Sequence, residues 1–142
     1  MTDNPSVGLD FLMRTKIMKF ILPEVAAQLD YQQDSPYHDF TLWEHTKKVV
    51  ENTSKDLDLR WAALLHDIGK PIMRYQKPKK DYPNYVFHEK IGAEMALKIA
   101  LYLRWSTERM KNVYSLVKYH LREESPLKEA DDRSKLWKEQ TQ

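Results

Sequence analysis

The sequence predicts an all-α protein, a bundle of about six to seven helices. The 142-residue chain contains only three glycines, and residues alternating in the manner of strands are scarce. Sheets need more turn residues than this, whereas apolar residues recur here at helical spacing. One irregular loop or short hairpin is expected at 72–87, where Pro78 and Pro83 lie among aromatic and basic residues.

Composition indicates one soluble domain. A length of 142 residues, 42% hydrophobic content and four tryptophans suit a single folded unit over 1–142, with 1–6 and 139–142 frayed. The net charge of +2 is too balanced to indicate nucleic acid by itself, and the lack of cysteine excludes disulfides and thiolate metal sites. No apolar run is long enough to cross a bilayer and no signal peptide is recognisable, so a cytoplasmic protein without a membrane partner is expected.

The first expected helix runs from Leu9 to Ile21 and is closed by Pro23, with Ser6 as a candidate N-cap. Its stripe consists of Leu9, Leu12, Met13, Ile17, Phe20 and Ile21. A short helical turn over 24–29 and a polar loop over 30–39 follow.

Two helices are expected in the middle of the chain. Thr41 and Glu44 form a capping box at the start of one. The other, over 57–66, is strongly apolar, with Gly69 placed as its C′ residue and Pro71 barring continuation.

Three more helices are expected in the second half. His88 opens one of them, and Ser106 caps the next. Ser125 followed by Pro126 predicts the start of the last helix, which runs to about Lys138.

The chain has five histidines, His38, His45, His66, His88 and His120. All but His38 lie on an apolar stripe or at a helix boundary, where their side chains can reach a shared pocket. Asp67 follows His66 after an apolar run, and burying a lone carboxylate costs several kcal/mol. A positive group is therefore expected beside Asp67, while His38 is expected to make a structural hydrogen bond.

Histidine and carboxylate without cysteine suit a divalent transition metal, namely Mn, Fe, Co, Ni or Zn, with Mg also compatible. Five or six such ligands exceed the number that one tetrahedral zinc uses. The set indicates either one ion with spare ligands or two ions about 3.5–4 Å apart bridged by a carboxylate. Asp67 is the natural bridge.

Longer strings around these residues resemble the HD superfamily of metal-dependent phosphohydrolases. They also resemble the HD region that accompanies tRNA nucleotidyltransferases (CCA-adding enzymes) and bacterial poly(A)-polymerase-like proteins. The resemblance spans roughly 9–122 and includes Trp43-Glu44-His45-Thr46, the run from Leu59 to Pro71 and the run from Phe87 to Ala96. Nothing resembles the nucleotidyltransferase head, so this chain is not expected to add CCA.

The resemblance implies a first metal held by His45, His66, Asp67 and a late aspartate. It assigns His88 and His120 to a second metal, as in subfamilies with extra histidines. Ala130-Asp131 matches the family's Ala-Asp pairing better than Asp132 does, so Asp131 is the preferred last ligand.

The function implied is a metal-dependent phosphohydrolase, a phosphatase or a cyclic or linear phosphodiesterase, acting on a nucleotide or RNA-end phosphate. His66 and Asp67 are candidate catalytic residues. Lys70 is a candidate for both catalysis and substrate binding, although it could simply complement the helix dipole. Arg74 is a second substrate-binding candidate.

Two other functions stay open. A non-catalytic module could bind RNA or a nucleotidyltransferase partner, and a structural metal could merely join the helices. Near-zero net charge counts against tight RNA binding, which needs several phosphate contacts. The oligomeric state is left open.

Overall fold

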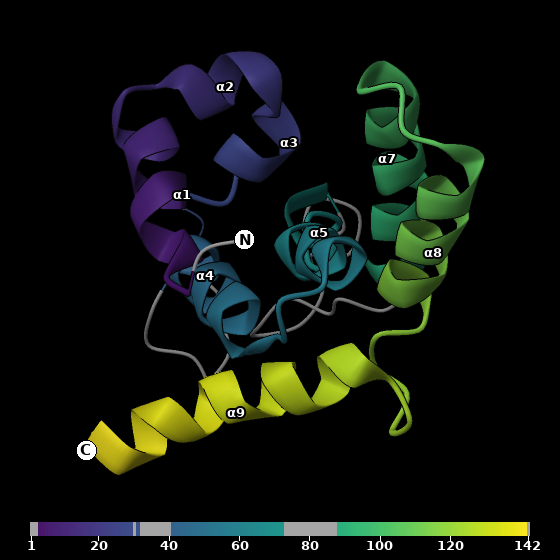
Figure 1. The fold of residues 1–142 in the computed structure, drawn as a ribbon. Helices are drawn as coiled ribbons and strands as arrows, with labels where there is room; N and C mark the ends of the chain where they lie inside the picture. Colours follow the sequence, from purple (N-terminus) through teal and green to yellow (C-terminus); the bar gives the residue numbers. More distant parts are fainter. Residues whose placement is uncertain (1–2, 30, 32–40, 73–87, 142) are drawn as a thin grey trace.

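The computed structural model describes residues 3–29, 31, 41–72 and 88–141, with the backbone alone over 134–141. Within these residues the chain forms helices and no strand, which confirms the all-α prediction (Figure 1). Eight helices are labelled: α1 (Pro5–Arg14), α2 (Ile17–Ile21), α3 (Pro23–Ala26), α4 (Leu42–Asn52), α5 (Leu57–Leu65), α7 (His88–Tyr102), α8 (Thr107–Lys118) and α9 (Pro126–Thr141). The expected loop or hairpin, apart from residue 72, lies outside the described residues, as do His38 and Arg74.

The first expected helix is interrupted, which corrects the prediction of one continuous element. Lys16 adopts a left-handed backbone conformation with φ of 67°, which ends α1 and starts α2 in a new direction. The polypeptide therefore forms an arch of three short helices (Figure 1). Ser6 is not the N-cap: α1 starts with Pro5 at its first position, and the Ser6 hydroxyl donates a hydrogen bond to Glu51 of α4.

The other predicted N-caps are confirmed. Side-chain oxygens of Thr41, Ser106 and Ser125 accept hydrogen bonds from backbone amides in the first turns of α4, α8 and α9, at 3.3, 3.2 and 3.2 Å. Asp56 caps α5 in the same way, accepting from the Leu59 amide at 2.8 Å. These caps fix where the site-bearing helices begin.

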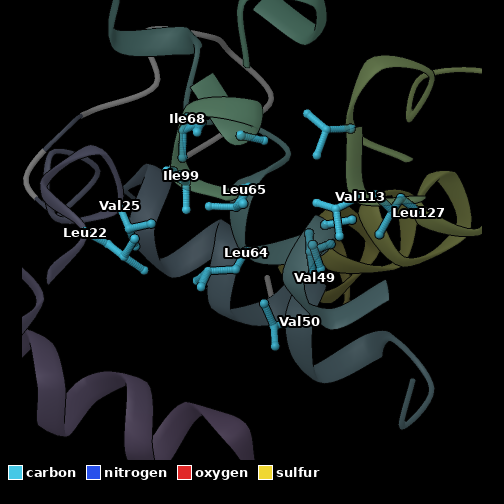
Figure 2. Packing of buried hydrophobic residues seen from close by; sticks show 14 of the residues in the cluster. Leu22, Val25, Val49, Val50, Leu64, Leu65, Ile68, Ile99, Val113 and Leu127 are labelled. Carbon is cyan, nitrogen blue, oxygen red and sulfur yellow. The ribbon is translucent and has the colours of Figure 1, made fainter. Parts of the chain in front are cut away.

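Helix α5 occupies the centre of the fold. A helix that buries nearly all of its faces needs neighbours on every side, and Ala62, Ala63, Leu64 and Leu65 are all buried. In Figure 1, α4 lies to the left of α5, α9 runs below both, and the packed pair α7 and α8 lies to the right. Leu65 and Ile68 project into a shared apolar cluster with Ile99 of α7 and Val49 of α4 (Figure 2).

Gly69 has a different role from the one predicted. No described glycine has a positive φ, so Gly69 is not a left-handed C′ residue, and α5 already ends at Leu65. A Cβ at Gly69 would overlap the carbonyl oxygen of His88 and lie 2.9 Å from the Gly92 amide nitrogen. Glycine is needed here because the end of α5 approaches the backbone of α7. Pro71 lies in a further helical turn at 70–72 rather than stopping α5 itself.

Replacing Gly69 with alanine should destabilise the protein by about 2–3 kcal/mol, because the clash is with backbone atoms that cannot move cheaply. Chemical denaturation measures this change. Gly8→Ala in α1 is the matched control, since a Cβ there meets no atom within 4 Å. Alanine is the better helix former, so this control should be neutral or stabilising by up to about 1 kcal/mol. Equal stability of the two variants would contradict the close-approach argument.

Candidate metal centre

Six side chains from helices far apart in the sequence meet beside the end of α5, and none is more than 5% exposed. Each lies on a helix or close to a helix end. They are His45 in α4, His66 and Asp67 at the end of α5, His88 at the start of α7, His120 just past α8, and Asp131 in α9. The packing of α4 on α9 and of α7 on α8 brings them together.

The first group contains His45, His66, Asp67 and Asp131, each offering a ligand atom within 4.8 Å of the others. The Nε2 atom of His45 lies 2.8 Å from Asp131 Oδ1 and 3.4 Å from Asp67 Oδ2. The Nε2 atom of His66 lies 3.1 Å from Asp67 Oδ2 and 3.6 Å from Asp131 Oδ1. Ligands bound to one ion at about 2.0–2.2 Å lie at most about 4.4 Å apart, so the group has suitable dimensions.

The second group contains Asp67, His88 and His120. The Nε2 atoms of His88 and His120 lie 3.1 and 3.7 Å from Asp67 Oδ1, and 3.4 Å from each other. Asp67 is thus common to both groups. Its Oδ2 faces His45 and His66, and its Oδ1 faces the other two histidines.

Backbone carbonyls orient two of the rings. Nδ1–H of His66 donates to the carbonyl oxygen of Ala63, and Nδ1–H of His120 donates to that of Val117, both at 2.6 Å. The last carbonyls of a helix have no amide partner in the helix, so a histidine three residues further on can bond to them. With Nδ1 occupied in this way, each neutral ring presents the lone pair of Nε2 to the site.

The electrostatics differ between the two groups. Burial lowers the pKa of a histidine, but Asp67 and Asp131 outweigh burial and raise the pKa of His66 to about 10. Burial, together with the charge of His66, lowers the pKa of His120 to about 4. Burial opposes ionisation of the aspartates, yet neighbouring histidines hold the pKa of Asp67 and of Asp131 well below the usual value.

The donor set fits a divalent cation. Nε2 of His66 is buried and has no hydrogen-bond partner among the described residues, although two carboxylate oxygens lie nearby. In the neutral ring this lone pair faces negative charge, an arrangement that a proton or a metal ion stabilises. Imidazole nitrogen with carboxylate oxygen suits the transition metals expected from the sequence.

The two late aspartates lie in different surroundings. Asp131 is buried beside His45, whereas Asp132 points outward and accepts from Lys128 Nζ at 2.8 Å. The predicted positive neighbour of Asp67 is present too: Lys70 Nζ lies 3.3 Å from Asp67 Oδ2. Lys70 therefore partly neutralises the shared carboxylate.

Glu89 and the two orienting carbonyls were not identified from the sequence as part of the site. Glu89 Oε2 lies 3.5 Å from His88 Nδ1, on the side of that ring facing away from the site. The two carbonyl contacts could have been expected from the sequence, because His66 and His120 each come at or just after the end of a predicted helix. For Glu89 only adjacency to His88 pointed to the contact.

Comparison with known proteins gives the family. The HD domain model matches residues 40–140. A CC-adding tRNA nucleotidyltransferase of Thermus thermophilus is 33% identical over 119 residues, which are 80% of this chain and 27% of the relative. A multifunctional CCA protein of Pseudomonas fluorescens is 31% identical over 99 residues, 67% of this chain and 23% of the relative.

The matches confirm the predicted resemblance but cover a fragment of each relative: the chain spans about a quarter of their length. No solved structure matches it. Across the described residues, no helix is long and apolar enough to cross a membrane. HD domains form a superfamily of metal-dependent phosphohydrolases. The match over more than half of the sequence shows that this chain belongs to the HD domain family.

Proposed function

We propose that this chain is a metal-dependent phosphohydrolase that cleaves a phosphate ester of a nucleotide or an RNA end. The observation that carries the proposal is the buried carboxylate of Asp67, whose two oxygens face two separate pairs of histidines. Relatives that process tRNA support a nucleotide or RNA substrate. A cytoplasmic location is part of the same proposal.

In this proposal His45, His66, Asp67 and Asp131 hold one divalent ion, and His88, His120 and Asp67 hold a second. Such ions, when bound, lower the pKa of water and polarise the phosphoryl oxygen. The protein's part is to orient the rings through Ala63 and Val117 and to exclude bulk water from the ligands.

Lys70 is proposed to contact the substrate phosphate. It is 9% exposed, and its ammonium lies beside Asp67, so a positive charge stands at the edge of the ligand set. His66 and Asp67 are proposed as the residues on which hydrolysis depends most. Arg74 keeps its proposed substrate-binding role on sequence grounds.

The non-catalytic alternative is less well supported. A module that only binds RNA or protein has no use for six buried ionisable side chains, which are costly to keep without a ligand. A purely structural ion would need about four of them. The carboxylate of Asp67, which both groups share, favours a catalytic site.

Metal analysis tests the ligand assignment. Protein equilibrated with Mn²⁺ and freed of excess metal should contain two ions per chain, whereas His120→Asn should contain one. Elemental analysis by mass spectrometry measures the ratio. Asp132→Asn is the matched control and should retain two ions, because Asp132 faces Lys128 instead. Equal metal content in wild type and His120→Asn would refute the second site.

Activity is tested on a generic phosphomonoester and on 2′,3′-cyclic nucleotides with protein loaded with Mn, Co or Ni. Hydrolysis is expected, and His66→Ala should reduce kcat at least about 100-fold, since ligand loss costs no less than loss of a residue supporting a ligand. Asp132→Asn should keep near-wild-type kcat. The proposal fails if wild type does not exceed the His66→Ala rate on any substrate.

Protons and metal should compete at His66. Its folded pKa of about 10 lies above the ordinary value of 6.5, so its stabilising charge in metal-free protein is complete below pH 6.5 and lost as pH rises toward 10. Metal affinity should rise over the same range, because binding displaces that proton.

Thermal unfolding in the presence of chelator measures the stability of the metal-free protein at pH 7 and pH 9. Calorimetric titration measures the metal affinity at the same two pH values. Lysines and tyrosines also titrate at alkaline pH, and His66→Gln controls for them. The quantity compared is therefore the difference in stability between wild type and this variant. A metal-free wild type that gains stability relative to His66→Gln between pH 7 and pH 9 would contradict the assignment.

A further inference from the structure

A cationic groove lies next to the candidate metal centre. The groove of about 330 Å³ runs between the first turn of α7 and the end of α8. Its lining residues are Glu89, Lys90, Lys118, Tyr119, Leu121 and Arg122. Three cations and one carboxylate give these residues a net charge of +2, so the groove favours an anion.

The cations at the α8 end are held in place by aromatic rings. The guanidinium carbon of Arg122 lies 4.0 Å from the centroid of Tyr119, and Lys118 Nζ lies 5.3 Å from the same centroid. The Arg122 amide also donates to the Tyr119 carbonyl at 3.1 Å, which fixes the turn. In the described part of the chain no carboxylate pairs with Lys90, Lys118 or Arg122. Their charge is therefore available to a ligand.

The groove adjoins the second group of ligands. Glu89 follows His88 and contacts its Nδ1, and Tyr119 and Leu121 flank His120 in the chain. Because consecutive Cα atoms are about 3.8 Å apart, the backbone of the groove begins one residue from each of these two histidines. The side-by-side packing of α7 and α8 holds the two features together (Figure 1).

We propose that this groove binds a second phosphate of the substrate, away from the ester that is cleaved. The substrate class is then a phosphate ester with a further phosphate group, such as a nucleoside bisphosphate or an oligonucleotide. Arg122 offers a planar donor pair and Lys118 a point charge, whereas Glu89 keeps the anion toward the α8 end. This inference rests on the proposed function for the position of the cleaved ester.

Equilibrium binding to the Mn²⁺-loaded protein tests the inference without depending on turnover. The first probe is adenosine carrying a 3′-methylenephosphonate, which resists hydrolysis at its carbon–phosphorus bond. The second adds a 5′-phosphate, and the third is an RNA trinucleotide with the same 3′ end. Calorimetry should show about tenfold tighter binding for at least one of the latter two, the size expected of a charge-assisted hydrogen bond.

Arg122→Gln and Lys118→Gln should each reduce this preference to about twofold or less. Lys111→Gln removes a charge from an exposed position of α8 outside the groove and should keep the preference. Arg122→Lys retains the charge and should keep part of the binding preference. This result would show that the loss in Arg122→Gln is not caused by misfolding. A preference for the 5′-phosphate probe identifies any second phosphate as the ligand, whereas a preference for the trinucleotide alone identifies the RNA backbone.

The groove inference is overturned if wild type shows no preference, or if both glutamine variants keep it. Its failure is distinct from failure of the proposed function. A protein that hydrolyses phosphate esters but shows no preference loses only the groove assignment. A protein that shows the preference but hydrolyses nothing keeps an anion site and loses the hydrolase.

Discussion

The buried carboxylate of Asp67 is the constraint on which the rest of the site depends. It is 2% exposed, and a single ionised group at that depth would cost several kcal/mol without partners. Four histidine nitrogens and the Lys70 ammonium lie within 3.7 Å of its two oxygens. No single helix could supply all of them, so the carboxylate stays ionised only where several helices meet.

Helix ends make that meeting possible. Carbonyls in the last turns of α5 and α8 accept hydrogen bonds from the His66 and His120 rings, so the backbone itself sets which nitrogen faces the site. Gly69 lets the end of α5 approach the backbone of α7, which positions Asp67 beside His88. Because the ligand candidates come from separate helices, metal binding and correct packing should be energetically linked.

The candidate metal ligands and the proposed second phosphate site use neighbouring residues of the same two turns. His88 and His120 face inward to Asp67, while the residues that flank them line a cationic groove. This chain corresponds to about a quarter of the length of its tRNA nucleotidyltransferase relatives.

The sequence by itself predicted the all-α class and the caps at Thr41, Ser106 and Ser125, because capping chemistry and apolar periodicity are local. Its resemblance to the HD superfamily pointed to the six residues that converge. The sequence did not predict the break at Lys16, since no local sequence pattern marks a residue other than glycine that adopts a left-handed backbone conformation. Only the tertiary structure put Asp131 beside His45 with Asp132 outside, and explained Gly69 by a neighbouring backbone. Those features depend on how helices pack against one another, which local patterns do not contain.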